Sequence, residues 1–92
     1  MNPTRARKRI RELASAGKWE VTAHAVGRMI ERQVDQADVF RVLLRAPACL
    51  AADRSNRSRW RLEGLDGRGD SLTVIVEIRA LALVVTMFRG DE

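Results

Sequence analysis

The sequence predicts an α+β domain in which N-terminal helices pack on one face of a roughly four-stranded antiparallel sheet. Two observations carry this prediction. In the first half of the chain, apolar residues recur at the three- and four-residue spacing of helices, and in the second half they recur at the two-residue spacing of strands. A chain of 92 residues has the size of one domain, residues 1–92, which must share one core.

Three helices are expected before the first strand. Asn2 is placed to cap a helix over residues 3–16, and Thr22 is placed to cap the second helix. Asp35 starts the third helix, which Pro47 ends because proline cannot continue a helical hydrogen-bond ladder. The second and third helices should therefore form a corner.

Four strands are expected after the helices, joined by hairpin-like turns. They cover residues 48–53, 59–64, 72–78 and 81–88. The last of them is almost wholly apolar, so we expect it in the middle of the sheet. Residues 19–21 alternate between apolar and charged but are too few to assign beyond a short extended connector. If the helices cover one face of the sheet, its other face is left open.

The second helix carries two sets of side chains with different surroundings. The set expected to face the core is Ala25, Val26, Met29 and Ile30. His24, Arg28 and Arg32 recur every four residues, so they line up along one edge of the helix. Because this edge is polar, we expect it to face solvent.

The chain is strongly basic, and its excess charge is almost wholly arginine. Lys and Arg number 17 against 12 Asp and Glu, a net charge of +5, and only Lys8 and Lys18 are lysines. Guanidinium groups bind phosphate oxygens in pairs and stack on flat bases. We therefore expect an anionic partner, with RNA first. The competing interpretation is that the charge only keeps a small domain in solution.

Several classes of protein are excluded by what the sequence lacks. Cys49 is the only cysteine, so no intrachain disulfide can form and a structural zinc site lacks ligands. We expect no metal and no cofactor. No apolar region follows the basic N-terminal residues, as a secretory signal requires, and the longest apolar stretch, residues 80–88, is too short to span a bilayer. A cytoplasmic protein with no membrane contact is expected.

The polar edge of the second helix offers a simple chemistry. His24 lies in the first turn, where the helix dipole and the nearby Arg28 favour a neutral imidazole that can accept a proton. Arg28 and Arg32 can hold a phosphate close to it. A base for the ribose 2′-hydroxyl and cations for the phosphorane are the minimum needed for RNA cleavage without a metal. Taken alone, a single histidine is more often structural.

The sequence around this edge resembles the bacterial family called domain of unknown function 4258. The matching pieces are Thr22–Ala25, Arg28–Arg32 and Val34–Asp35, followed later by Trp60–Gly64, the strand from Leu72 and Val84–Arg89. The helical pieces are the more specific, because several polar residues recur at fixed spacing. One departure is visible: Gln33 stands where the family usually has glycine, which puts the end of the second helix in doubt.

This resemblance implies a toxin-like endoribonuclease with the fold of the barnase/RelE group. Members of the family are often encoded beside small zinc-finger antitoxins, so the resemblance implies a cognate antitoxin and an RNA partner, free or on the ribosome. RelE-like enzymes commonly use a tyrosine, and this chain has none. Acid–base work must then fall on His24, Glu63 or Glu77.

The candidate residues form two overlapping sets. The catalytic candidates are His24, Arg28, Arg32 and Glu63. The candidates for binding phosphate are Arg28, Arg32, Arg59, Arg61 and Arg89. Trp60, at an alternating strand position, is expected in the core rather than stacked on a base.

Two alternatives to an enzyme remain open. The chain can be a non-catalytic basic module that binds nucleic acid or an acidic protein, or a toxin fold retained as a regulator. An exposed His24 on one surface with both arginines favours the enzyme. A buried His24 bonded to the backbone favours the module.

Overall fold

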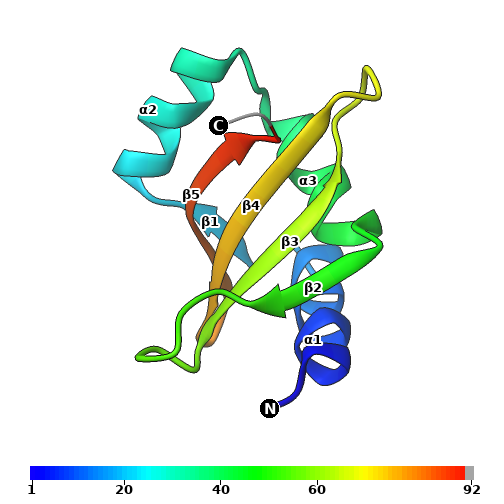
Figure 1. The fold of residues 1–92 in the computed structure, drawn as a ribbon, viewed down its shortest axis with the longest axis vertical. Coiled ribbons are helices and arrows are strands. Elements are labelled where there is room, and N and C mark those ends of the chain that lie inside the picture. The colour runs from blue at the N-terminus through cyan, green and yellow to red at the C-terminus, as the bar shows by residue number, and fades with distance from the viewer. Residues whose placement is uncertain (91–92) are drawn as a thin grey trace.

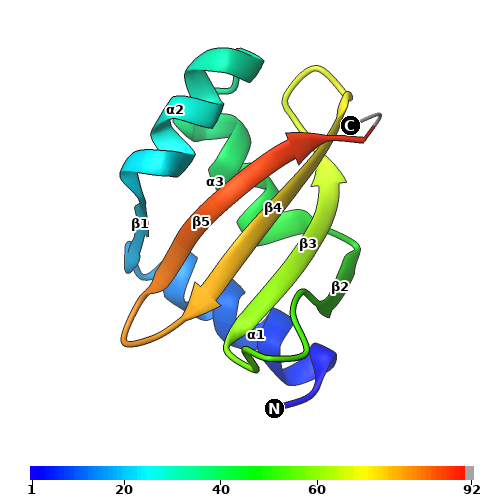
Figure 2. The same ribbon diagram turned by 60° about the vertical axis from the view of Figure 1, so that its left-hand side comes forward.

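The computed structural model describes residues 1–90, which form three helices and five strands in two layers (Figures 1 and 2). In chain order the elements are α1 (Pro3–Ser15), β1 (Trp19–Val21), α2 (Ala23–Arg32), α3 (Gln36–Arg45), β2 (Ala48–Ala51), β3 (Arg59–Leu65), β4 (Ser71–Ile78) and β5 (Ala82–Arg89). The predicted α+β class, with helices before the main strands, is confirmed.

The sheet is mixed and has one more strand than expected. Its order is β1-β5-β4-β3-β2, with every neighbouring pair antiparallel except β1 and β5, which are parallel. The extra strand is β1, which the sequence suggested only as an extended connector. Three residues are too few to show a strand period, and their partner lies more than 60 residues away. The central strand is β4 rather than β5, although β5 is also flanked on both sides.

The core lies between the sheet and the helices α1 and α3, which cover its rear face in Figure 1. Its largest fully buried side chains include Ile10, Leu43, Leu62, Val74 and Met87. Trp60 is 4% exposed and packs in this core, as expected. The front face of the sheet is covered by none of the three helices (Figure 1), and we call it the open face.

Helix α2 does not lie behind the sheet with the other two helices. It runs beside β5, over the part of that strand's edge that β1 leaves unpaired (Figure 2). Only a narrow strip of α2, Ala25 and Met29, is buried. The expectation that Val26 and Ile30 face the core is wrong, because they are 44% and 76% exposed. A strand edge covers less of a helix than a sheet face does.

The two ends of α2 are formed as the sequence indicates, with one irregularity. Thr22 is the N-cap, and its hydroxyl accepts a hydrogen bond from the backbone N–H of Ala25 at 3.1 Å. Gln33 is the C-cap and takes the left-handed conformation, with φ of 54°. The helix therefore ends where the family usually has glycine, at a cost of about 1–2 kcal/mol for a residue with a side chain.

A buried ion pair fastens the far end of α2 to the sheet. The Nη1 of Arg89, at the end of β5, lies 2.6 Å from a carboxylate oxygen of Asp66, and its Nη2 donates to the carbonyl of Arg32 at 3.2 Å. Burial alone would raise the pKa of Asp66, but hydrogen bonds from Arg89 and from the N–H groups of Asp70 and Arg68 outweigh it and lower this pKa to about 2. Asp66 thus stays ionised and holds Arg89.

The placement of α2 predicts effects of different size on stability for two neighbouring apolar residues. Met29→Ala removes a buried side chain and should lower the free energy of unfolding by about 2 kcal/mol or more. Ile30→Ala should change it by less than about 0.5 kcal/mol, because that side chain already faces solvent. Urea denaturation followed by circular dichroism measures both values. Equal losses would mean that α2 is oriented differently.

The Asp66–Arg89 pair predicts how stability depends on acid. A carboxylate whose pKa is lowered by folding stabilises the fold above its unfolded value of 3.8, and this contribution disappears as the pH falls towards about 2. Asp66→Asn should therefore lower the free energy of unfolding at neutral pH by about 3 kcal/mol and flatten its decline in that range. Asp70→Asn, on the same loop but 66% exposed, is the control. If both variants decline as steeply as the wild type, the pair has no such role.

Candidate functional site

An irregularity in β5 decides which of its side chains reach the open face. Val85 has no partner residue in β4, because the register between the two strands shifts at this point. Such a β-bulge reverses the alternation of side chains beyond it. Thr86 and Phe88 therefore lie on the open face, while Met87 and Arg89 lie on the helix side, with Met87 fully buried. A regular strand would have turned Thr86 into the core.

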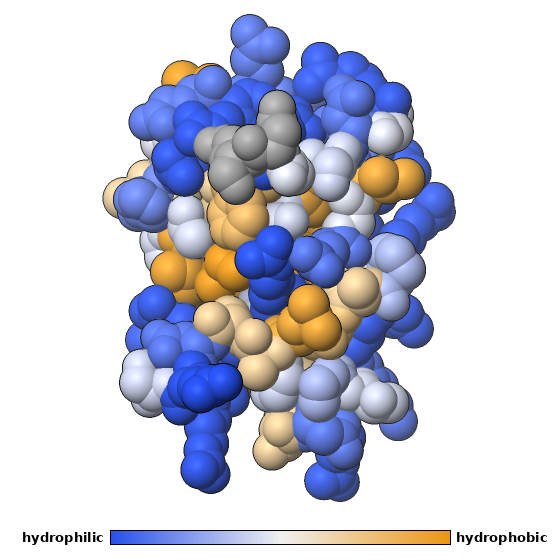
Figure 3. Space-filling model, viewed as in Figure 1, coloured by the Kyte–Doolittle hydropathy of each residue, from blue (hydrophilic) through white to orange (hydrophobic). Residues whose placement is uncertain are grey.

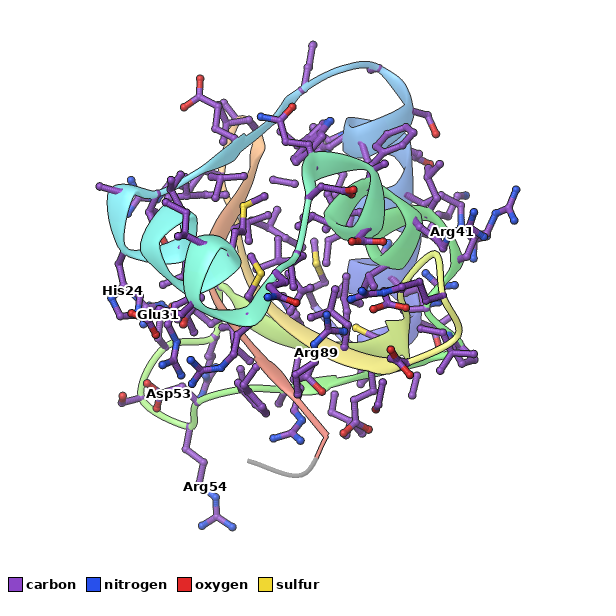
Figure 4. All side chains as sticks on the ribbon, turned by 90° about the horizontal axis from the view of Figure 1, so that it is seen from above. His24, Glu31, Arg41, Asp53, Arg54 and Arg89 are labelled. Atoms are coloured by element: carbon purple, nitrogen blue, oxygen red, sulfur yellow. The ribbon has the colours of Figure 1, made fainter. Side chains whose placement is uncertain are left out.

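The junction between β1 and α2 is fixed to this bulge. The backbone N–H of Thr22 donates to the carbonyl of Val84, and its hydroxyl donates to the carbonyl of Val85, both at 3.0 Å. His24 follows two residues later, and its Nε2 lies 3.2 Å from the Thr86 hydroxyl. The imidazole is exposed. His24 thus reaches the open face from the first turn of α2, as Figure 4 shows from above.

A second cationic group approaches the same stretch of β5 from β3. Across the open face, Arg61 of β3 lies opposite Ile75 of β4, which in turn lies opposite Thr86. The guanidinium of Arg61 reaches across β4 and stands 5.0 Å from the centre of the Phe88 ring. Phe88 and Thr86 are about 7 Å apart along the strand. The Arg61 guanidinium and the His24 imidazole therefore converge on neighbouring side chains.

Glu63 takes part in this arrangement by holding Arg61. The Nε of Arg61 donates to a carboxylate oxygen of Glu63 at 3.1 Å, and its Nη2 lies 3.1 Å from the same oxygen. Both side chains are about two-fifths exposed. An arginine fixed by a carboxylate and by an aromatic ring keeps little freedom, so less entropy is lost when it binds an anion.

The remaining arginines of the α2 edge share one carboxylate that the sequence analysis missed. Glu31 lies 3.6 Å from the Nη1 of Arg28 and 2.9 Å from the Nη1 of Arg32, and in Figure 4 it points to the same side of α2 as His24. The Nε of Arg28 is buried and has no hydrogen-bond partner among residues 1–90. The three-residue spacing between Arg28 and Glu31 in the sequence could have predicted their ion pair, because residues three apart are neighbours on a helix.

Three further predicted residues, Glu77, Arg59 and Arg89, make contacts outside this group. Glu77 is 5% exposed and accepts hydrogen bonds from Arg59, Asn56 and Arg79. The hydrogen bonds from Arg59 and then Asn56 lower its pKa, so at neutral pH it is an ionised carboxylate that holds cations. Arg59 is thereby committed to Glu77, and Arg89 to Asp66 on the helix side of the sheet.

The open face combines apolar and charged surfaces. Figure 3 shows apolar side chains gathered in its middle, with hydrophilic ones above and below them. Within residues 1–90, no group of three or more His, Cys, Asp and Glu side chains is placed to hold a metal ion, and no helix is long and apolar enough to cross a bilayer. We call the following group the open-face site: His24, Thr86, Arg61, Glu63 and Phe88, with Arg28 one helical turn from His24 along α2. Its side chains are of the types that bind anions and move protons.

The open-face site lies within the part of the chain that matches a known family. The model of the family described as domain of unknown function (DUF4258) covers residues 21–89, which is more than half of the chain. No curated protein and no solved structure matches this chain. The match spans every residue from α2 to the end of β5, and the chain therefore belongs to the DUF4258 family.

Proposed function

We propose that this chain is a toxin-like endoribonuclease that cleaves RNA laid across the open face of the sheet, without a metal ion. One observation carries the proposal. An exposed imidazole, fixed by the Thr86 hydroxyl, stands on the surface that the Arg61 guanidinium also reaches. The toxin role follows from the resemblance to families encoded beside antitoxins.

His24 is the general base in this proposal. When Nε2 carries the ring hydrogen and donates to the Thr86 hydroxyl at 3.2 Å, the Nδ1 of the neutral ring keeps its lone pair. That nitrogen can take the proton of a ribose 2′-hydroxyl. Thr86 acts as a positioning residue, because it orients the ring without touching the reacting atoms.

The reaction needs only groups of the RNA, the chain and water. His24 takes the proton, the 2′-oxygen attacks the adjacent phosphorus, and the bond from phosphorus to the 5′-oxygen breaks. Water protonates the leaving 5′-oxygen, and the imidazolium returns its proton to solvent. The products are a 2′,3′-cyclic phosphate and a 5′-hydroxyl. Because the nucleophile belongs to the substrate, no metal-bound water is required.

Arg28 and Arg61 supply the positive charge that the pentacoordinate phosphorane demands. Arg28 follows His24 by one helical turn, so both side chains lie along the same edge of α2. Arg61 is held in place by Glu63 and Phe88. Preorganised donors of this kind contribute more than mobile ones, since they do not reorganise as the charge develops. Glu63 is thus a positioning residue.

The shape of the face favours single-stranded RNA. Bases in a single strand can lie flat on exposed aromatic and arginine planes, and the Arg61–Phe88 pair forms such a platform. The antitoxin implied by the family resemblance, of zinc-finger type, would inhibit by covering this face.

A non-catalytic interaction module is the second candidate. The observation that favours it is the outer side of α2, where Val26 and Ile30 expose apolar side chains one turn apart. Exposed apolar pairs on a helix are typical of protein contacts. This function would use the same basic chain to bind a partner and would require no role for His24.

His24→Ala should lower the rate of RNA cleavage about a hundred- to ten-thousand-fold, because the proton acceptor is lost. Arg28→Ala should lower it about a hundredfold or more through the loss of charge stabilisation. Purified variants are compared by gel analysis of a labelled RNA, with melting curves to confirm the fold. Arg41→Gln is the matched control: this exposed arginine of α3 points away from α2 in Figure 4.

Two results would contradict the proposed function. One is a His24→Ala variant that cleaves RNA at the rate of the wild type. The other is a wild-type chain that cleaves no RNA, including RNA on ribosomes, and such a result would favour the interaction module.

A further inference from the structure

A second cationic feature lies away from the open-face site, at the opposite edge of the sheet. A groove of about 550 Å³ separates the first half of α1 from β2 and the residues before it. Three cationic side chains, Arg7, Lys8 and Arg11, line it together with Cys49, and no carboxylate among residues 1–90 does. Elsewhere the arginines of β3 and β5 contact carboxylates. This groove therefore concentrates positive charge that the fold leaves uncompensated.

The arginines of the groove make contacts with the fold, but not all of their guanidinium N–H groups have a hydrogen-bond partner within residues 1–90. The Nε of Arg11 donates to the carbonyl of Leu44 at 3.1 Å, which fixes Arg11 against the end of α3. The Nη1 of Arg7 is buried and has no hydrogen-bond partner in the described part of the chain. Burial, and after it the neighbouring Arg11, lower the pKa of Arg7. An anion between the two guanidiniums would relieve their repulsion.

We propose that this groove is a second anion site, which binds a backbone phosphate of the RNA strand whose cleavage occurs at the open-face site. The inference rests on the proposed function for the identity of its ligand. It adds a contact remote from the reacting atoms that anchors and orients the strand.

The geometry of the sheet connects the two sites. From Thr86 the open face runs through Ile75 and Arg61 to Leu50 on β2, which is the edge strand. Three strand spacings make this path about 14 Å long. The residue next to Leu50 is Cys49, which lines the groove on the other side of β2. A strand that crosses the open face from His24 and turns around the edge at β2 thus arrives at the groove.

RNA fits this arrangement better than an acidic protein segment. Its phosphates repeat at regular intervals, so one strand can place a phosphate at each site. The forked guanidiniums of Arg7 and Arg11 match the paired oxygens of a phosphate.

Cys49 provides a local reporter, because it is the only thiol of the chain and lines the groove. The rate of its alkylation by iodoacetamide is measured with and without a 2′-O-methyl oligoribonucleotide, which binds as RNA does but cannot be cleaved. Binding is followed in parallel by fluorescence anisotropy at several salt concentrations. We expect the oligonucleotide to slow alkylation severalfold in the wild type.

Two groove variants and one control complete the experiment. Lys8→Gln changes an exposed residue and Arg7→Gln a half-buried one, so the first remains informative if the second folds poorly. Each should weaken binding, lessen the protection of Cys49 and reduce the slope of log affinity against log salt by about 1. Arg9→Gln removes the same charge from α1 outside the groove, where Arg9 lies 3.8 Å from Glu12, and should retain protection.

Binding of the oligonucleotide without protection of Cys49 would overturn the inference, as would equal effects of Lys8→Gln and Arg9→Gln. Protection by a polyglutamate peptide but not by the oligonucleotide would also overturn it, in favour of an acidic protein partner. Because the probe cannot be cleaved, a wild type that protects Cys49 but cleaves no RNA would sink the proposed function and leave the anion site standing.

Discussion

The site depends on the unpaired residue Val85 in β5 and on the Thr22 hydroxyl that binds its carbonyl. The bulge turns Thr86 and Phe88 to the open face and sends Arg89 to the helix side. The same hydroxyl caps α2 by accepting from Ala25. One side chain therefore sets both where the helix begins and where it meets the sheet. The contact between His24 and Thr86 follows from these two constraints.

Two groups of arginines in the chain differ in their surroundings. Asp66 and Glu77, both nearly fully buried, hold Arg89 and Arg59 in ion pairs that stabilise the fold. Burial of such carboxylates is tolerated only because each receives several hydrogen bonds. Arg28, Arg61 and Arg7 instead belong to the two surfaces at which we propose that an anion binds. The net charge of +5 therefore does not show how unevenly positive charge is distributed over the fold.

Local patterns in the sequence were sufficient for the fold class and the helix caps, but not for the contacts that make the site. Thr22 and Asp35 are caps as predicted, because capping depends on residues within one turn. The partner of His24 could not be predicted, since it lies 62 residues away and depends on a bulge that leaves no period in an apolar strand. Ile30 was misplaced because apolar spacing does not show how much of a helix is covered. The roles of Arg59 and Arg89 were equally hidden, because their carboxylate partners are brought near by folding.

The central claim is that the 2′-hydroxyl of the substrate is the nucleophile, activated by His24 without a metal. The most direct test incubates the wild-type chain, in the presence of EDTA, with an RNA and with the same RNA carrying 2′-deoxyribose at the cleaved nucleotide. We expect the RNA to be cut to a 2′,3′-cyclic phosphate and a 5′-hydroxyl and the deoxy-substituted strand to stay intact at that position. Cleavage of the deoxy-substituted strand at that position, or products that carry a 5′-phosphate, would contradict it.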